Sequence, residues 1–125
     1  MFFKIRITLF LLLIVQMNFA QTYSIQDFGA VADGITLNTK AIQEAIDKCF
    51  TDGGGRVYVP AGVFVTGTLH LKSNINLYLE SGAVLKGSHS MGDYEPFERP
   101  GFGPTHYGIF FTLMAENVSI TGYGT

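Results

Sequence analysis

The residues whose side chains could take part in catalysis or ligand binding gather between positions 93 and 106. They are Asp93, Glu95, Glu98, Arg99 and His106. Two carboxyl groups perform acid–base catalysis only when their surroundings push their pKa values apart, and nothing in this segment indicates such a difference. We therefore interpret the cluster as part of a solvated loop. Arg99 and His106 remain candidate contacts for a carboxylate on a bound substrate.

Metal and phosphate chemistry find little support in the sequence. The three histidines, His70, His89 and His106, share no metal-ligand spacing, and no cysteine or carboxylate joins them in a recognised pattern. We predict no metal site and no cofactor. The glycine run 53–55 follows a predicted helix and precedes a strand, which is the reverse of the order in phosphate-binding loops. Asn117-Val-Ser119 matches the N-glycosylation acceptor pattern, which matters only in a eukaryotic source.

The elements that position these residues begin after an expected leader sequence. Lys4 and Arg6 precede an apolar run over residues 7–15, and Ala20 precedes the expected cleavage point of a signal peptide covering residues 1–20. The apolar run is too short for a membrane span, which needs about 20 residues. We therefore expect a secreted or periplasmic protein with no membrane association after signal cleavage.

The mature chain, residues 21–125, is acidic. It carries six Lys and Arg against ten Asp and Glu, a net charge of −4. This balance lacks the electrostatic footprint of a protein that binds nucleic acid or anionic membranes, and a polyanionic ligand would need a local basic site. Cys49 is the one cysteine, so a disulfide within the chain is impossible and a buried thiol is expected. We expect a monomer.

The stretch from Gly53 to Gly87 predicts several short β-strands. Apolar and polar residues alternate over 57–59, 69–71 and 75–79, and Gly, Pro, Ser or Asn closes each run. The inner face is aliphatic, and the outer face is polar or aromatic: His70, Lys72, Asn76, Tyr78 and Glu80. Tight two-residue turns of the Asn-Gly or Asp-Gly kind, which favour antiparallel hairpins, do not connect these strands. The pattern predicts an all-β fold, a right-handed parallel β-helix.

One amphipathic helix is predicted before these strands, with Asn38 as its N-cap. One face carries apolar residues at helical spacing: Ile42, Ala45, Ile46 and Cys49. The other face is polar and is interpreted as solvated: Gln43, Glu44, Asp47 and Lys48. The glycines from Gly53 onward end the helix. Stacked windings leave an apolar end that needs a cap, and we assign that role to this helix.

The flanking segments are less regular. Residues 23–28 alternate and predict a first strand, followed by a loop over 30–37 with a turn at Asp33-Gly34. Residues 88–107 are rich in proline and glycine and predict a long, functional loop. Strand patterns return over 109–115 and 118–121. Because no closing helix or polar terminal segment follows, we expect the domain to be truncated at its C-terminus, within a winding.

Two blocks of residues carry a family resemblance. The first comprises Asp27-Phe-Gly-Ala30, Asp33-Gly-Ile-Thr36, Asn38-Thr39 and Ala41-Ile-Gln-Glu-Ala-Ile-Asp47. It resembles the N-terminal cap of the pectate-lyase-like β-helix superfamily. The cap is a specific indicator of the fold but a weak indicator of the activity, because lyases, hydrolases, epimerases and phage tailspikes share it.

The second block is more specific for activity. It runs through Gly54–Gly62, Thr66–Leu69, Leu71–Leu77, Leu79–Leu85 and Gly87-Ser88, followed by Asp93-Tyr94, and closes with Asn117-Val-Ser-Ile-Thr-Gly-Tyr-Gly-Thr125. With the cap, it resembles the opening third of a polygalacturonase-type enzyme of glycoside hydrolase family 28. The resemblance covers nearly all of the mature chain.

The resemblance implies hydrolysis of galacturonan or rhamnogalacturonan in pectin with inversion. Such a reaction uses two carboxyl groups roughly 6.5–9.5 Å apart. The family's catalytic aspartates, its His-Gly and its Arg-x-Lys motif lie beyond the position of Thr125, so the resemblance places no catalytic residue in this chain and implies an inactive fragment. Its implied partner is a pectic polysaccharide, with Arg99 and His106 as low-ranking substrate contacts at the cleft edge.

Alternatives stay open at this stage. A β-helix polysaccharide lyase or uronan epimerase would share the cap, as would a non-catalytic carbohydrate-binding or adhesin module. Three aromatic residues are predicted to point outward from neighbouring strands, where they could stack on sugar rings: Tyr58, Phe64 and Tyr78. Outward aromatic residues also occur on strands without any ligand.

Overall fold

The computed structural model describes residues 21–103 and 107–125. The predicted signal peptide, residues 1–20, and the candidate His106 lie outside this range. The elements follow one another as β1 (Gln21–Ser24), the 3₁₀ helix η1 (Ile25–Phe28), β2 (Asp33–Leu37), α2 (Thr39–Thr51), β3 (Gly55–Val59), β4 (Gly62–Thr66), β5 (Leu69–His70), β6 (Ile75–Leu79), β7 (Ala83–Gly87), the 3₁₀ helix η2 (Met91–Asp93), β8 (Phe110–Phe111) and β9 (Ser119–Gly122).

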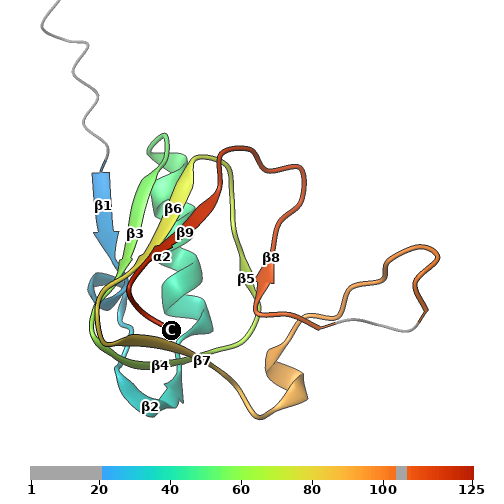
Figure 1. The fold of residues 1–125 in the computed structure, drawn as a ribbon, viewed down its shortest axis with the longest axis horizontal. Coiled ribbons are helices and arrows are strands. Elements are labelled where there is room, and N and C mark those ends of the chain that lie inside the picture. The colour runs from blue at the N-terminus through green and yellow to red at the C-terminus, as the bar shows by residue number, and fades with distance from the viewer. Residues whose placement is uncertain (1–20, 104–106) are drawn as a thin grey trace, which may run out of the picture.

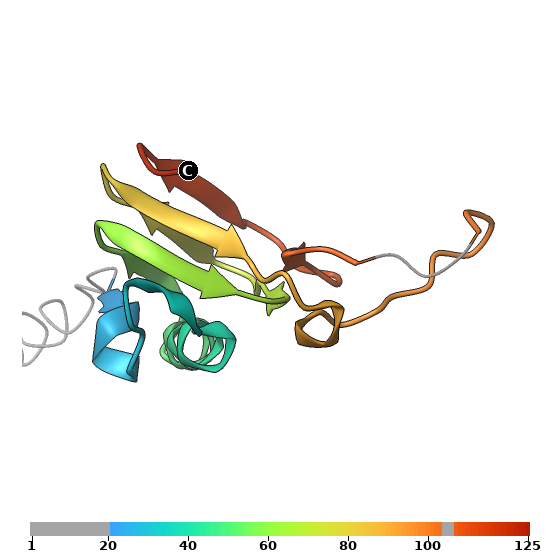
Figure 2. The ribbon, with the colours of Figure 1, turned by 90° about the horizontal axis from the view of Figure 1, so that it is seen from below.

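The strands form three parallel sheets. Their orders are β1-β3-β6-β9, β2-β4-β7 and β5-β8, and every pairing is parallel. After α2 the chain visits the three sheets in a constant order, so β6, β7 and β8 lie beside β3, β4 and β5. We call one such pass a winding. Figure 2 shows the successive windings as layers, and the prediction of parallel neighbours is confirmed.

Alternation along the strands separates a buried face from an outer one. The buried side chains of β3 and β6 are Val57, Val59, Ile75, Leu77 and Leu79, as predicted. Strictly paired registers place these aliphatic rows above one another, with Val57 beside Leu77 and Val59 beside Leu79. The core therefore continues from one winding to the next, because each winding buries the apolar row of its neighbour.

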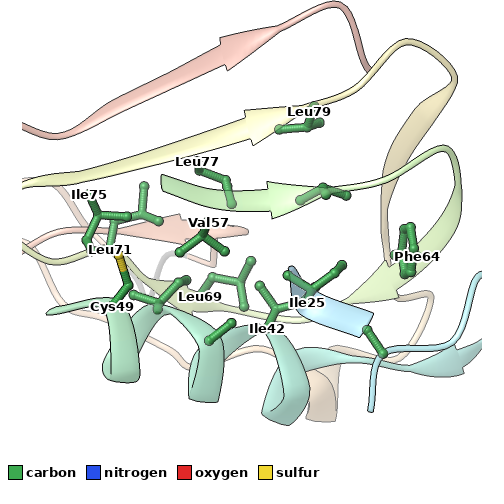
Figure 3. Close-up of a cluster of buried hydrophobic side chains, with 14 of the residues drawn as sticks. Ile25, Ile42, Cys49, Val57, Phe64, Leu69, Leu71, Ile75, Leu77 and Leu79 are labelled. Atoms are coloured by element: carbon green, nitrogen blue, oxygen red, sulfur yellow. The ribbon is translucent and has the colours of Figure 1, made fainter. Parts of the chain in front are cut away.

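Helix α2 covers the apolar end of this core. Ile42, Ala45, Ile46 and Cys49 are each 0% exposed, which confirms the predicted apolar face and the buried thiol. In Figure 3, Ile42 and Cys49 extend from α2 toward Val57 and Leu69 of the strands and Leu71, which follows β5. Burial raises the pKa of the Cys49 thiol above its ordinary value.

The C-terminal end of α2 is tied to the first strand. Lys48 Nζ lies 3.1 Å from Asp52 Oδ1, and the Tyr23 hydroxyl donates a hydrogen bond to the same carboxylate. That bond raises the pKa of Tyr23 to about 12 and lowers the pKa of Asp52. Gly53 then takes a φ of 100°, the left-handed conformation expected for a glycine that ends a helix.

The predicted N-cap role of Asn38 is wrong in detail. Asn38 occupies the N-cap position, but its side chain makes no capping hydrogen bond. The buried amide instead accepts a bond from Val31 N–H at 2.8 Å and donates to Val31 O and Thr36 O, each at 3.0 Å. A side chain with both donors and an acceptor can close a loop in this way, and here it holds the segment before α2 together.

Three sequence predictions for residues 23–64 need correction. The predicted strand over 23–28 is divided, because Ser24 ends β1 and η1 turns Ile25 inward, where it is 0% exposed. The predicted loop over 30–37 contains β2, which pairs with β4. Phe64 does not point outward, since it is 0% exposed within β4. Its neighbours Val65 and Thr66 are also buried, so β4 does not alternate between a buried and an outer face.

The segment between β7 and β8 confirms the long predicted loop, with η2 as its regular element among the described residues. Figure 1 shows it leaving the windings on the side of β5 and β8. The following strand is shorter than the predicted 109–115, because only Phe110–Phe111 pairs with β5. Among residues 21–103 and 107–125, no helix is long and apolar enough to cross a membrane.

Candidate functional site

A small pocket forms where the loop after β7 folds back against β5 and β8. Its volume is about 90 Å³, and it is lined by Thr68, His70, Glu95, Pro96, Phe97 and Phe111. A second hollow, of about 270 Å³, lies over β9 and β7. That hollow is bounded largely by aliphatic side chains, whereas the first combines aromatic rings with an imidazole and a carboxylate. We take the first, the β5–β8 pocket, as the candidate site.

Thr68 ties two points of the loop, Glu95 and Gly108, to the start of β5. Its Oγ1 accepts a hydrogen bond from Glu95 N–H at 2.9 Å and donates one to Gly108 O at 2.8 Å. The Thr68 residue is 5% exposed, so these bonds are shielded from water. A buried hydroxyl that serves as both donor and acceptor gives the returning loop a defined position.

The polar wall of the β5–β8 pocket is an imidazole–carboxylate pair. His70 Nε2 contacts the Glu95 carboxylate, and the two side chains are 38% and 66% exposed. Glu95 therefore retains solvent access. Because both side chains are partly exposed, solvent limits the contribution of this pair to stability.

The opposite wall is aromatic. The Phe111 ring meets the His70 ring edge-on, with centroids 5.3 Å apart and planes at 73°. Phe97, from the loop, lies 5.6 Å from Phe111 at an angle of 50°. Edge-to-face and tilted contacts of this kind favour defined ring positions. The register of β5 and β8 brings this about, since it places His70 beside Phe111.

Helix α2 holds the strand that carries His70. Gln43 Oε1 accepts a bond from His70 N–H at 2.8 Å, and Gln43 Nε2 donates to His70 O at 3.1 Å. Asp47 lies 2.8 Å from Lys72 Nζ and accepts a bond from Gln43 at 3.0 Å. Burial acts to raise the pKa of Asp47, but the bonds from Lys72 and Gln43 outweigh it and lower that pKa. The predicted solvated face of α2 is therefore partly a contact surface for β5.

Arg99, the one predicted substrate contact among the described residues, does not line the β5–β8 pocket. Arg99 is exposed, and its guanidinium carbon lies 4.2 Å from the centroid of the Phe102 ring. Glu98 is likewise exposed, whereas Glu95 enters the pocket. Sequence reasoning identified His70 as outward-facing but did not pair it with Glu95. No local signal in the sequence indicates which loop carboxylate returns to β5.

The pocket favours binding over catalysis. Inverting hydrolysis of a glycoside needs two carboxyl groups, and among the described residues Glu95 is the only carboxylate that lines this pocket. No group of three or more His, Cys, Asp or Glu in residues 21–103 and 107–125 is arranged to hold a metal ion. Aromatic rings beside a few polar groups can orient a sugar ring, which is the chemistry that the geometry supports best.

Parallel strands in stacked windings, with one helix over the apolar end, define a pectate lyase-like β-helix domain. The chain belongs to the family described as "Rhamnogalacturonase A/epimerase, pectate lyase-like", whose model matches residues 22–118. This match includes helix α2, strands β3 to β8 and the whole loop between β7 and β8, and it ends just before β9.

The chain is also similar to individual proteins and to a solved structure. The chain is 56% identical over 71 residues to an exo-poly-alpha-D-galacturonosidase from Dickeya chrysanthemi, covering 57% of this chain. It is 44% identical over 114 residues to a probable polygalacturonase from Vitis vinifera, covering 82% of this chain. The structure also resembles a family 28 exopolygalacturonase from Yersinia enterocolitica, with a TM-score of 0.77 and 39% identity over 83% of this chain.

These relatives are much longer than the present chain. The similarity covers 12% of the Dickeya protein, 23% of the Vitis protein and 20% of the Yersinia structure. The chain therefore spans less than a quarter of the length of each of these relatives.

Proposed function

We propose that this chain is the N-terminal portion of a secreted, pectin-degrading glycoside hydrolase that acts on galacturonan or rhamnogalacturonan with inversion. The observation that carries the proposal is the family match over residues 22–118, together with relatives named for polygalacturonate. The constant order of three parallel sheets supports a right-handed parallel β-helix as the fold of the complete domain.

In this proposal the described residues supply structure and substrate contacts. Helix α2 caps the windings, and the β5–β8 pocket borders the substrate cleft. The family resemblance implies that the catalytic aspartates lie C-terminal to Thr125, so residues 21–125 would not be active alone. Residues 1–20 would direct export and be removed. The mature protein would be a monomer that needs no cofactor.

A second function is favoured by the name of the matching family, which joins a rhamnogalacturonase with an epimerase. An epimerase would invert a carbon of a uronate residue without shortening the polymer. A lyase would cut the polymer by elimination and leave an unsaturated uronate at the new end. A non-catalytic module would bind the polymer and leave it unchanged. The three alternatives therefore differ in their products.

The decisive experiment uses the complete protein encoded by the gene. It is incubated separately with polygalacturonate, rhamnogalacturonan and a mannuronate polymer, and reducing ends, unsaturated uronate and polymer length are measured. We expect new reducing ends without unsaturated product from a pectic polymer. Proton NMR of the first product would show the inverted anomer. Unsaturated ends, or epimerised polymer of unchanged length, would refute the hydrolase and support the corresponding alternative.

A further inference from the structure

The outer face of the β1-β3-β6-β9 sheet carries an ordered set of polar and aromatic side chains. Parallel register places Arg56 beside Asn76 and Asn76 beside Ser119. Two positions further along, Tyr58 lies beside Tyr78, with ring centroids 6.2 Å apart and planes at 13°. We call Arg56, Tyr58, Asn76 and Tyr78 the β3–β6 outer patch. It belongs to a different sheet from the β5–β8 pocket.

Arg56 is held in place although it is exposed. Its Nε donates a hydrogen bond to Asn76 Oδ1 at 3.1 Å, and its guanidinium carbon lies 4.5 Å from the centroid of the Tyr78 ring. Asn76 is itself oriented, because its Nδ2 donates to Ser119 Oγ at 2.8 Å and Thr121 Oγ1 at 2.9 Å. The hydrogen bonds to β9 thus hold the Asn76 side chain in position, and Asn76 in turn orients the Arg56 guanidinium.

The outer nitrogens of this guanidinium are available to a ligand. Within residues 21–103 and 107–125, Arg56 makes no ion pair, and its only hydrogen bond uses Nε. By contrast, Lys48 and Lys72 are each paired with an aspartate. An arginine that is already oriented loses less conformational entropy when its two terminal nitrogens bind a carboxylate. An acidic chain would need such a local basic site for an acidic ligand.

We propose that the β3–β6 outer patch is a second binding site for a uronate-bearing glycan strand, with Arg56 forming two parallel hydrogen bonds to a sugar carboxylate. This inference rests on the proposed function, which supplies demethylated galacturonan as the ligand. The parallel tyrosine rings extend the patch along the sheet, and the Tyr58 hydroxyl is held there by a hydrogen bond that it donates to Glu80 Oε2 at 3.2 Å. Bound there, the polymer would keep the enzyme on its substrate while the cleft on another sheet acts.

The test measures binding of the complete protein to immobilised polygalacturonate and to highly methyl-esterified pectin. Arg56→Ala should weaken binding to polygalacturonate about tenfold, the loss expected for a charge-assisted bidentate contact. Arg56→Lys should restore it only in part, because an ammonium group lacks the planar fork. Asn76→Asp, which sets a carboxylate against the retained guanidinium, should weaken binding as Arg56→Ala does. Lys86→Ala, at an exposed lysine of β7, is the matched control and should bind as the unaltered protein does.

Two further readouts separate this site from the catalytic cleft. The rate of hydrolysis of a short soluble oligogalacturonide should be unchanged in Arg56→Ala, and binding to methyl-esterified pectin should be unaffected. Equal polygalacturonate binding by Arg56→Ala and the unaltered protein, with hydrolysis intact, would overturn the second site and leave the proposed function standing. An equal loss in Lys86→Ala, or a loss on esterified pectin, would also overturn it. Failure of the unaltered protein to hydrolyse any pectic polymer would instead refute the proposed function.

Discussion

At the scale of single residues, Asn38 shows how one buried amide can organise a segment. It satisfies the backbone of Val31 and Thr36 and leaves the first turn of α2 uncapped by its side chain. The sequence pattern correctly predicted that Asn38 lies directly before the helix. It could not reveal that the hydrogen-bond partners of the Asn38 side chain lie upstream in the chain. Capping and loop closure use the same donors and acceptors, and the path of the chain selects between them.

Substituting Asn38 should therefore destabilise the protein more than loss of a helix cap alone would indicate. Asn38→Ala leaves three hydrogen-bonding groups of the preceding segment without their partner, and we expect a loss of about 1–3 kcal/mol in the free energy of unfolding. Chemical denaturation of the complete protein measures it. The control is Gln26→Ala, at an exposed residue whose side chain makes no hydrogen bond within the described residues. Equal stability of both variants would contradict the assignment.

Asp33 provides a pH-dependent prediction at the same scale. Its carboxylate accepts bonds from Thr36 Oγ1 at 2.6 Å, Thr36 N–H at 2.7 Å and Ile35 N–H at 2.9 Å. These bonds lower the pKa of Asp33 from 3.8 to about 2. A carboxyl group whose pKa is lower in the folded protein than in the unfolded chain stabilises the fold at any pH above its unfolded pKa. This stabilisation is lost as the pH falls through the pKa of the folded state.

Asp33→Asn should thus lower the melting temperature at neutral pH, and the difference from the unaltered protein should shrink as the pH falls from 3.8 toward 2. Melting temperatures of the two proteins, measured across this range, check the expectation. Asp27→Asn serves as the control, since Asp27 is exposed and its side chain makes no hydrogen bond in residues 21–103 and 107–125. A difference that is independent of pH would show that the Asp33 carboxylate has no role in the effect.

Arg99 remains a predicted substrate contact. Arg99 is exposed on the loop, with its guanidinium over the Phe102 ring. In the complete enzyme, Arg99→Ala should raise KM for polygalacturonate about two- to fivefold with little change in kcat, the range of an exposed ion pair. His106→Ala tests the second predicted contact in the same assay. Unchanged KM values in both variants would remove both residues from the substrate site.

At the scale of elements, the loop between β7 and β8 is docked more tightly than its composition indicates. Gly67 marks the closest approach, because a Cβ atom placed there would lie 1.8 Å from Asp93 O. Gly67 N–H also donates to Thr39 Oγ1 at 2.7 Å, so the loop, β4 and the start of α2 meet at one point. A residue without a side chain is required there for steric reasons, independently of its backbone conformation.

Gly67→Ala should displace the loop from the windings. We expect a destabilisation of about 1–3 kcal/mol, typical of overpacking, and faster proteolysis within residues 91–103. Gly92→Ala is a matched control in the same loop, because the nearest atom to its added Cβ would be Ser90 Oγ at 3.7 Å. Limited proteolysis of the complete protein, with fragments identified by mass spectrometry, compares the variants. Identical cleavage rates would argue against close docking at Gly67.

At the scale of the whole molecule, the last described winding presents apolar surface. The hollow of about 270 Å³ is lined by Leu79, Leu85, Ile109, Phe110 and Ile120, among others. Strand β9 pairs on one side only, with β6. Beyond β9 the chain turns toward β7, where Thr125 O accepts a bond from Leu85 N–H at 2.9 Å. This edge has the form of a surface that another winding would cover.

Residues 21–125 produced alone should consequently self-associate and should release no reducing ends from polygalacturonate. Exposed strand edges and apolar cross-sections favour association between chains. Size-exclusion chromatography with light scattering, and a reducing-end assay on the same preparation, measure both expectations. A monodisperse and active preparation would contradict them.

The residue pattern was sufficient to predict much of the fold. Period-two alternation over 57–59 and 75–79 identified strands, and helical spacing from Ile42 to Cys49 identified the capping face. Both signals are local, since they report which side of an element meets the core. The resemblance in the cap and the strands named the family that the model match over residues 22–118 confirms.

Other features depended on contacts between residues far apart in the chain. Burial of Phe64, the pairing of His70 with Glu95 and the fixing of Arg56 by Asn76 all follow from strand register and loop return. No local periodicity encodes these distances, because register is set by how whole windings pack upon one another. The sequence alone therefore specified the elements and their inward faces, while packing between windings selected the side chains that meet in the β5–β8 pocket and the β3–β6 outer patch.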